Sequence, residues 1–193
     1  MIKIQGKIPR EVVVACSGGV DSMAVVDFLR RNHDVTAFYF DHGTEHGHKS
    51  GQFLKEYYSN TNVRFVGHKI QDTTVPKDTS QEEFWRNERY KWFNHLSKKD
   101  AVITCHHLDD CVETWVWSSM HGSSHSINYR HGEIIRPFRL NRKREFELWC
   151  KLQNVPYLED DSNKDLRYTR NYIRHEMMPH VLRVNPGIHK MLK

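Results

Sequence analysis

One stretch of ten residues collects side chains that bind metals, accept protons or hold charged substrates. CHHLDDCVET, residues 105–114, contains two cysteines, two histidines, two aspartates and one glutamate. Structural zinc sites usually space their ligands as Cys-x₂₋₄-Cys or His-x₃₋₅-His. Cys105 and Cys111 are separated by five residues, and His106 directly precedes His107. The spacing therefore does not favour a zinc site.

The carboxylates of this stretch suit another task. Asp110 and Glu113 are three positions apart, which places both side chains on one face of a helix. Two carboxylates on one face can hold a substrate ammonium group. Asp109 keeps two open interpretations, catalysis or capping, because the helix dipole alone favours acidic residues in a first turn. The two histidines are candidates for orienting a substrate or a neighbouring loop.

A second stretch, SGGVDS at residues 17–22, has the composition of a phosphate-binding loop. Its glycines allow a tight turn that brings backbone N–H groups close to an anion. Asp21 is expected to bind a Mg²⁺ ion that bridges phosphates. The stretch lacks the GK[ST] of a Walker loop and the GxGxxG of a dinucleotide loop, and a ligand-free turn stays open for the glycine pair alone. The expected ATP-binding residues are Ser17, Gly18, Gly19, Val20, Asp21 and Ser22, with His42 at the border of the nucleotide.

Strands and helices alternate along the chain and must position these two stretches. Strands are predicted at residues 11–17, 34–43, 63–70, 101–107 and 133–138. Helices are predicted at residues 21–32, 48–60, 80–99, 108–120 and 143–154, the third with Ser80 and Glu83 as a capping box. This alternation predicts an α/β fold, a Rossmann-like parallel sheet of about five strands with helices on both faces. Ligands of such sheets bind at the carboxyl ends of the strands, so residues 17–22, 41–46 and 105–113 should meet in one crevice.

The totals exclude several classes of protein. The 193 residues are enough for one domain, and no apolar run approaches the roughly 20 residues of a membrane span. Without a recognisable signal segment, a cytoplasmic protein is expected. The four cysteines form no Cys-x-x-Cys pair, so they are expected to be reduced and buried. A net charge of +5 permits a polyanionic partner.

Several motifs together resemble one family. SGGVDS resembles the PP-loop of enzymes that split ATP between its α- and β-phosphates, and CHHLDDCVET resembles the HHxDDxxET motif of tRNA(Ile)-lysidine synthetases. Residues 160–187 resemble the DxSNxDxxYxRNxIRxxxxPxLxxxNPG signature of that family, with Val181 in place of leucine. Residues 40–43 and 86–93 resemble two further family elements. The chain therefore resembles the catalytic domain of these ligases from about residue 11 onward.

The resemblance implies a two-step reaction that uses ATP and Mg²⁺. ATP adenylates the wobble cytidine of an isoleucine tRNA, and the amine of free L-lysine then replaces AMP to give lysidine. The implied catalytic residues are Asp21, Asp110, Glu113 and Arg174. The implied lysine-binding residues are Asp110, Glu113 and Arg170. Whether Arg170 or Arg174 pairs with the lysine carboxylate or with the phosphate charge stays open. Arg86 and Arg89 are candidates for RNA contact, with an ordinary solvated helix face as the equal alternative.

The sequence also departs from the family pattern. It stops at Lys193, so we expect a single PP-loop domain over residues 1–193, with a helical extension from about residue 160 and without the additional tRNA-binding domains. The histidine-rich loop at residues 42–48 lacks the family's LR. Three alternatives stay open: a nucleotide- or RNA-binding relative with altered catalysis, a pyrophosphatase acting on another tRNA base, and one acting on a small molecule. Residues 142–144 are interpreted as an exposed helix start, Trp115 and Trp117 as core, and a homodimer is possible.

Overall fold

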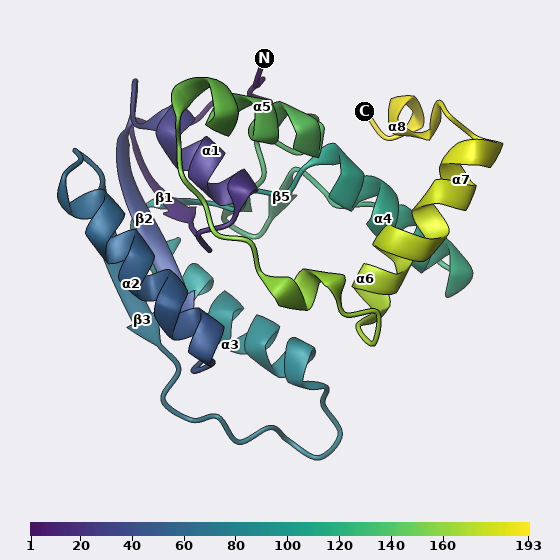
Figure 1. The fold of residues 1–193 in the computed structure, drawn as a ribbon, viewed down its shortest axis with the longest axis horizontal. Helices are drawn as coiled ribbons and strands as arrows, with labels where there is room; N and C mark the ends of the chain where they lie inside the picture. Colours follow the sequence, from purple (N-terminus) through teal and green to yellow (C-terminus); the bar gives the residue numbers. More distant parts are fainter.

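The computed structural model describes the backbone of residues 1–193 and every side chain except that of Asp161. In this described chain, six strands form one sheet in the order β3-β2-β1-β4-β6-β5 (Figure 1). The sheet is parallel except for β5, which runs antiparallel to β6 at one edge. The strands are β1 Glu11–Ala15, β2 Asp34–Asp41, β3 Arg64–Lys69, β4 Ala101–Ile103, β5 Arg130–His131 and β6 Ile134–Ile135. The predicted α/β fold is confirmed, and β5 is an edge strand that the sequence did not indicate.

The first strand occupies the point where the order of the sheet reverses. β1 pairs with β2 on one side and with β4 on the other, so the chain winds outward in both directions from it. In open α/β sheets the ligand crevice lies outside the carboxyl ends of the strands at this switch point. Residues 17–22 follow β1 and residues 105–114 follow β4. The topology therefore places both chemistry-bearing stretches beside the same crevice.

Helices cover the two faces of the sheet. The helices are α1 Val20–Leu29, α2 Glu45–Ser59, α3 Gln81–Leu96, α4 Leu108–Met120 and α5 Lys143–Gln153. Side chains of α1, α2 and α5 pack on one face, whereas α3 packs on the other. Alternation along β1 explains the division, because Val12 and Val14 join the first cluster and Val13 joins the second.

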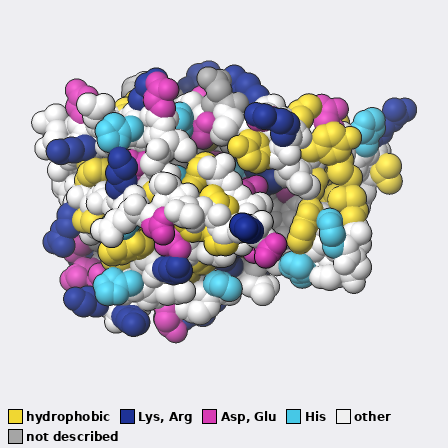
Figure 2. Space-filling model, turned by 90° about the horizontal axis from the view of Figure 1, so that it is seen from below, with side chains coloured by type: hydrophobic (Ala, Val, Ile, Leu, Met, Phe, Trp, Pro, Cys, Tyr) yellow, Lys and Arg dark blue, Asp and Glu magenta, His cyan; other side chains and the backbone are white. Residues whose placement is uncertain are grey.

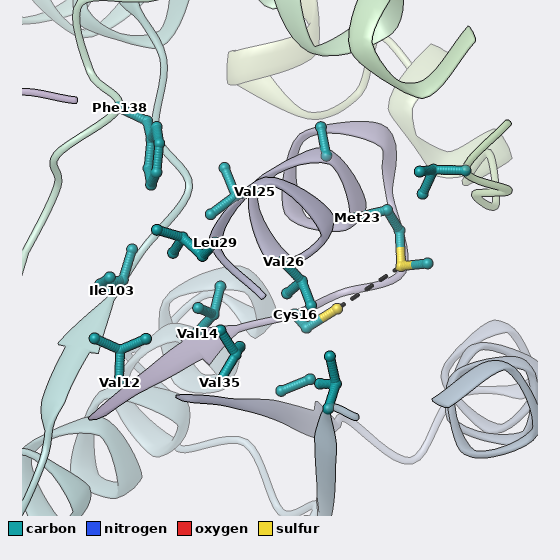
Figure 3. Close-up of a cluster of buried hydrophobic side chains, with 14 of the residues drawn as sticks. Val12, Val14, Cys16, Met23, Val25, Val26, Leu29, Val35, Ile103 and Phe138 are labelled. Carbon is teal, nitrogen blue, oxygen red and sulfur yellow. Dashed lines mark hydrogen bonds between the residues drawn. The ribbon is translucent and has the colours of Figure 1, made fainter. Parts of the chain in front are cut away.

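The larger core lies between α1 and the central strands. Figure 3 shows Val25, Val26 and Leu29 of α1 above Val12 and Val14 of β1. Each such side chain contributes about 1.5–3 kcal/mol when it leaves water. This packing fixes the start of α1, and with it the loop at residues 17–22, against the sheet.

The chain after α5 consists of short helical segments that pack on α4. They are a 3₁₀ turn at Asp161–Lys164, α6 Thr169–Tyr172, a π-helical turn at Ile173–Met177, α7 Met178–Val184 and α8 Ile188–Met191. A third apolar cluster joins Val112 and Val116 of α4 to Ile173, Met178 and Ile188. Figure 1 shows α6 and α7 alongside α4. This contact brings residues from the end of the chain to the helix that carries Asp110 and Glu113.

Some predicted boundaries differ from the structure. The predicted strand at residues 101–107 ends at Ile103, because the residues that follow leave the sheet and lead into α4. The predicted helix at residues 48–60 starts earlier, at Glu45, because the Thr44 hydroxyl accepts the Gly47 N–H and caps it. Trp115 packs in the third cluster, but Trp117 is 40% exposed and stacks on His121, so its assignment to the core was wrong. No helix in the described chain has the length and apolar character needed to span a bilayer.

Candidate functional site

The loop after β1 is shaped by its own hydroxyl groups. Ser22 Oγ donates to the Gly19 carbonyl at 2.9 Å and accepts the Ser17 N–H at 3.2 Å. Gly18 has a φ of +88°, in the left-handed region that disfavours residues with a Cβ. Gly19 is the N-cap of α1, whose first N–H groups are left without intrahelical partners. The result is a preformed turn with free amides at a helix start, which suits a phosphate.

Asp21 carries the one carboxylate in the first turn of α1. Its Oδ1 atom is buried and has no hydrogen-bond partner in the described chain, and its Oδ2 atom lies 3.8 Å from His107 Nε2. Burial raises the pKa of Asp21, while the neighbouring His107 acts in the opposite direction. A buried carboxylate oxygen without a donor is a good ligand for a hard cation. Asp21 therefore fits the magnesium role that the sequence indicates.

The helix after β4 begins with a reciprocal cap. His107 Nδ1 accepts the Asp110 N–H at 3.1 Å, and Asp110 Oδ2 accepts the His107 N–H at 3.0 Å. Both side chains are buried. The sequence did not identify this capping box, although His107 immediately precedes the helix and Asp110 stands three residues later. Asp110 is therefore a structural residue as well as a candidate for substrate binding.

Two carboxylates and two guanidinium groups form the centre of the site. Arg174 donates from Nε and Nη2 to the two oxygens of Glu113, both at 2.8 Å. Asp110 Oδ1 accepts from Arg170 at 2.9 Å and from Arg174 at 3.2 Å. Burial acts to raise the pKa of Asp110, but His107 and Arg170 outweigh it and hold the pKa well below its usual range. The structure thus brings four of the five residues predicted for catalysis and lysine binding together as a neutral cluster of ion pairs.

Asp109 points away from this cluster. Its Oδ1 atom accepts from Arg142 Nε at 2.8 Å and lies 3.0 Å from His189 Nε2, and its Oδ2 atom accepts the Lys143 N–H at 2.8 Å. These contacts tie the start of α4 to α5 and α8. Asp109 is not the cap of its own helix, because His107 is, and its oxygens are engaged by other elements.

His106 lies between the carboxylates and several arginines. Its Nδ1 atom is 3.0 Å from Thr104 Oγ1. Burial lowers the pKa of His106 to about 3, Asp110 opposes the shift, and Arg136 and Arg170 add to it. His106 is therefore a neutral imidazole near pH 7.

His42 lies on the α3 side of the crevice. Its ring is 5.1 Å from the Phe40 ring and 5.2 Å from the Trp85 ring, and its Nδ1 atom is buried without a partner in the described chain. Burial lowers the pKa of His42 to about 4, and the charge of Arg89 adds to the shift. Its expected contact with the nucleotide stays a prediction.

Basic residues gather on α3 and beside it. The Arg86 guanidinium lies 4.6 Å from the centre of the Tyr90 ring and is exposed, whereas Arg89 is half-buried. Burial lowers the pKa of Arg89, and Arg86 and Arg170 lower it further. Arg136, which the sequence analysis missed, is buried and donates to Tyr90 Oη at 3.4 Å. In the described chain, no carboxylate lies within 4.0 Å of Arg89 or Arg136, so the group has capacity for an anion.

The histidine-rich loop joins the crevice through the segment after α5. His46 Nε2 lies 3.6 Å from Asp160 Oδ2, and the Leu158 N–H donates to the Gly18 carbonyl at 2.9 Å. Cys105 Sγ donates to the Ala15 carbonyl at 3.6 Å. Residues 17–22 and 105–113 therefore adjoin directly, and residues 41–46 border them through Asp160. Among the described side chains, no group of three or more His, Cys, Asp or Glu residues converges as a metal site.

A comparison with protein families identifies this arrangement. The model of the PP-loop domain family matches residues 2–181, which is nearly the whole chain. The chain belongs to the PP-loop domain family. Membership in this family supports ATP binding.

Two curated relatives of this PP-loop domain carry the same name. The tRNA(Ile)-lysidine synthase of Francisella tularensis subsp. novicida is 29% identical over 197 residues, covering 95% of this chain and 49% of the relative. The enzyme of the same name from Thermotoga maritima is 30% identical over 192 residues, covering 92% and 46%. The chain therefore spans about half the length of these relatives, and the family-level resemblance drawn from the motifs is confirmed.

Solved structures confirm the fold. The U34-tRNA thiolase NcsA from Methanococcus maripaludis, solved with its [4Fe-4S] cluster, superposes with a TM-score of 0.73 at 14% identity, covering 98% of this chain and 70% of the thiolase. The NH₃-dependent NAD synthetase from Campylobacter jejuni gives a TM-score of 0.52 at 16% identity, covering 97% and 83%. At these identities the likeness concerns architecture alone.

Proposed function

We propose that this PP-loop domain is the catalytic part of an ATP-dependent ligase that adenylates the wobble cytidine of isoleucine tRNA and joins lysine to it. One observation carries the proposal: the neutral cluster of Asp110, Glu113, Arg170 and Arg174 adjoins Asp21 at the switch point of the sheet. The names of the curated relatives support the same reaction. A site that suits an anionic nucleotide, beside a cluster of carboxylate–guanidinium ion pairs that suits an amino acid, fits a reaction between ATP and an amino acid.

The nucleotide step uses the PP-loop. The free amides at the start of α1 and the turn at Gly18 hold the phosphates, and Asp21 supplies the carboxylate that would bind magnesium. Magnesium, when bound, offsets charge on the phosphates and polarises them. Asp21 itself stays next to His107, whose cap fixes the start of α4. This contact links the PP-loop to the helix that carries the lysine cluster.

The lysine step uses the charge cluster. The α-ammonium of lysine would share the oxygens of Asp110 and Glu113, and its α-carboxylate would take Arg170. Such an exchange conserves net charge. The lysine brings one ammonium and one carboxylate, and these replace one carboxylate–arginine ion pair of the cluster. The side chain of Arg170 is 42% exposed and that of Arg174 is 23% exposed. Arg170 is therefore the arginine that can release its carboxylate, while Arg174 holds Glu113.

The RNA contact falls on α3. Arg86 lies over the Tyr90 ring and Arg136 donates to Tyr90 Oη, and in the described chain no carboxylate lies within 4.0 Å of Arg86, Arg89 or Arg136. A phosphodiester would supply the missing negative charge. We propose tRNA as the source of that phosphodiester, and the cytoplasm as the place of the reaction.

The test is a labelling assay. Incubation of the protein with ATP, magnesium, radiolabelled lysine and total tRNA should place label in tRNA, with AMP and pyrophosphate formed in proportion. Asp21→Asn should abolish AMP release, because the loop then lacks its carboxylate. Absence of label in every tRNA, with wild-type protein that binds ATP, would overturn the proposed ligase reaction.

A further inference from the structure

One face of α4 extends from the charge cluster to the end of the helix. Asp110, Glu113, Trp117 and His121 follow one another at spacings of three or four residues, which places their side chains on the same face. With a rise of about 1.5 Å per residue, Trp117 lies about 6 Å along the helix axis from Glu113. A nucleotide that reacts at the charge cluster therefore has its neighbours in the RNA close to Trp117.

The two flanks of α4 are covered by other segments, but this face is not. On one flank, Val112 packs in the third apolar cluster with the C-terminal helices. On the other flank, the chain that returns from the helix is tied to it, because Ser126 Oγ donates to the Cys111 carbonyl at 3.0 Å and Ser118 Oγ donates to the His125 carbonyl at 2.8 Å. Between these flanks, the last turn of the helix keeps exposed side chains.

Trp117 is an exposed aromatic ring with a fixed neighbour. Its side chain is 40% exposed, and Met120 beside it is exposed as well. The His121 ring stacks on Trp117 with ring centroids 4.5 Å apart and 30° between the planes, and His121 Nδ1 lies 2.8 Å from the Trp117 carbonyl oxygen. Because large aromatic side chains dominate the energetics of interfaces, this aromatic pair of Trp117 and His121 indicates a contact surface.

The charges around the aromatic pair favour RNA over an acidic or neutral protein surface as its partner. Residues 114–129 contain no aspartate or glutamate, so no carboxylate of this segment repels a phosphate backbone. Further along the chain, the centre of the His131 ring lies 5.8 Å from that of Tyr90, the ring that the Arg86 guanidinium covers. The chain after α4 therefore leads from the aromatic pair to the basic group on α3, where a phosphodiester is proposed to bind.

We propose that Trp117 and His121 form a stacking platform for an unpaired base of the RNA substrate, next to the nucleotide that reacts. This inference rests on the proposed ligase reaction, which brings the wobble nucleotide of an anticodon loop to the charge cluster. Proteins recognise RNA loops largely through unpaired bases that stack on aromatic side chains. Stacking accepts any base, so the platform orients the loop and leaves the choice of the reacting base to the site itself.

The sequence alone did not indicate this platform. Trp115 and Trp117 are two positions apart on one helix, so their indole rings lie on different faces. Trp115 packs in the third apolar cluster, whereas Trp117 stays exposed. The position of the C-terminal helices decides which of the two rings is covered.

The test measures binding of an anticodon stem-loop to wild type and to Trp117→Leu by fluorescence anisotropy. Leucine keeps an apolar side chain but has no ring to stack on a base, so the affinity should fall about tenfold. The slope of log K against log salt should stay unchanged, because no phosphate contact is lost. Tyr57→Leu, which removes one ring of the stacked Phe53–Tyr57 pair on α2, is the matched control and should leave the affinity unchanged.

Abasic stem-loops identify the base that stacks. Each unpaired nucleotide beside the wobble cytidine is replaced in turn by an abasic one. One replacement should weaken binding to wild type about tenfold and binding to Trp117→Leu less than about twofold, because the variant has already lost the contact. Trp117→Phe keeps a ring and should retain most of the affinity, and the melting temperature of each variant shows whether the domain is folded.

Unchanged RNA affinity in a folded Trp117→Leu variant would overturn the platform. Abasic replacements that weaken binding to wild type and to this variant equally would also overturn it. If only wild type self-associates in sedimentation while both bind RNA alike, the exposed rings belong to a protein contact instead. Loss of RNA affinity as expected, without label transfer to tRNA by wild type, would support the platform and refute the lysine ligase.

Discussion

The side chain of Asp110 carries two tasks at once. One oxygen closes the cap of α4, and the other accepts from two arginines. Glu113, one helical turn later, accepts two parallel hydrogen bonds from Arg174 and lies 3.7 Å from Arg170 Nε. Removal of Asp110 would therefore disturb both the helix and the substrate site, whereas Glu113 offers a cleaner test of substrate binding.

Glu113→Gln should slow lysine transfer more than adenylation. The substitution keeps the shape of the side chain but removes the charge that would hold the lysine ammonium. We expect the KM for lysine to rise about tenfold or more, and pyrophosphate release to change far less. Separate assays of pyrophosphate release and of lysine incorporation measure the two steps. Glu147→Gln, on the exposed side of α5, is the control, and equal loss of both steps would contradict the assigned role.

His42 should make stability depend on pH. Its pKa is about 4 in the folded chain, against an ordinary value of 6.5, because the imidazole is buried. Above pH 6.5 both states are neutral and His42 contributes nothing to the pH dependence. As the pH falls from 6.5 toward 4, the unfolded chain takes up the proton first, so stability decreases.

His42→Gln should make this decrease shallower. Urea unfolding at pH values between 7 and 4 gives the free energy of unfolding for wild type and variant. His180→Gln, at an exposed position, controls for the loss of an imidazole. A variant curve parallel to that of wild type would show that His42 titrates alike in both states.

At the scale of elements, two strand–loop–helix units make the crevice. The turn after β1 depends on a left-handed glycine, and the turn after β4 depends on the His107–Asp110 cap. The π-helical turn at Ile173–Met177 follows α6 and carries Arg174, while Arg170 belongs to α6 itself. The turn in each unit depends on contacts between residues close in sequence. The pairing of β1 with β4 brings the two turns side by side.

Gly18→Ala should impair ATP binding beyond its effect on stability. A Cβ at a φ of +88° costs about 1–2 kcal/mol and shifts the amides of the loop. Gly122 has a φ of +76°, has no atom within 4 Å of the place that a Cβ would occupy, and lies outside the crevice. Gly122→Ala should therefore lower stability by a similar amount and leave the Kd for ATP unchanged. Thermal unfolding and calorimetric titration with ATP measure the two effects, and equal ATP affinity in both variants would argue against the loop geometry.

At the scale of the whole molecule, basic side chains differ in whether they are paired with a carboxylate. The basic group on α3 adjoins the carboxyl ends of the strands, while Arg10 pairs with Asp34 at the opposite end. Figure 2 shows many Lys and Arg side chains toward the end of the molecule with α2 and β3, and hydrophobic ones gathered toward the end with the C-terminal helices. Exposed apolar residues in that region include Met120, Val184 and Met191. Because the basic group on α3 adjoins the carboxyl ends of the strands, we expect RNA to bind at that end and over α3.

Arg89→Gln should reduce the salt dependence of RNA binding. Loss of one contact to a phosphate lowers the slope of log K against log salt by about 0.7 for single-stranded RNA. Binding of an anticodon stem-loop is measured by fluorescence anisotropy at several salt concentrations. Arg10→Gln, which removes the same charge at the far end of the sheet, should leave the slope unchanged. A slope unaffected by Arg89→Gln would place the RNA elsewhere.

The fold class, the PP-loop and the helix that carries Asp110 and Glu113 follow from the sequence alone, and the bounds of that helix at Leu108–Met120 match the prediction. These features are local, because β-branched runs, glycine turns and helical spacing act over a few residues. The convergence of residues 17–22 and 105–113 was also predictable, because parallel strands end at one edge of a sheet.

Which charges are free depends on the packing of distant segments. Asp109 and Asp110 are neighbours of one type, yet one ties α4 to α5 and α8 while the other faces Arg170 and Arg174. Likewise, three consecutive basic residues lie in different environments. Arg142 pairs with Asp109, Lys143 is half-buried and Arg144 is exposed. The physical reason is that ion pairing depends on partners that are distant in sequence. Composition gives the number of charges, and packing alone determines which of them stay available to a substrate.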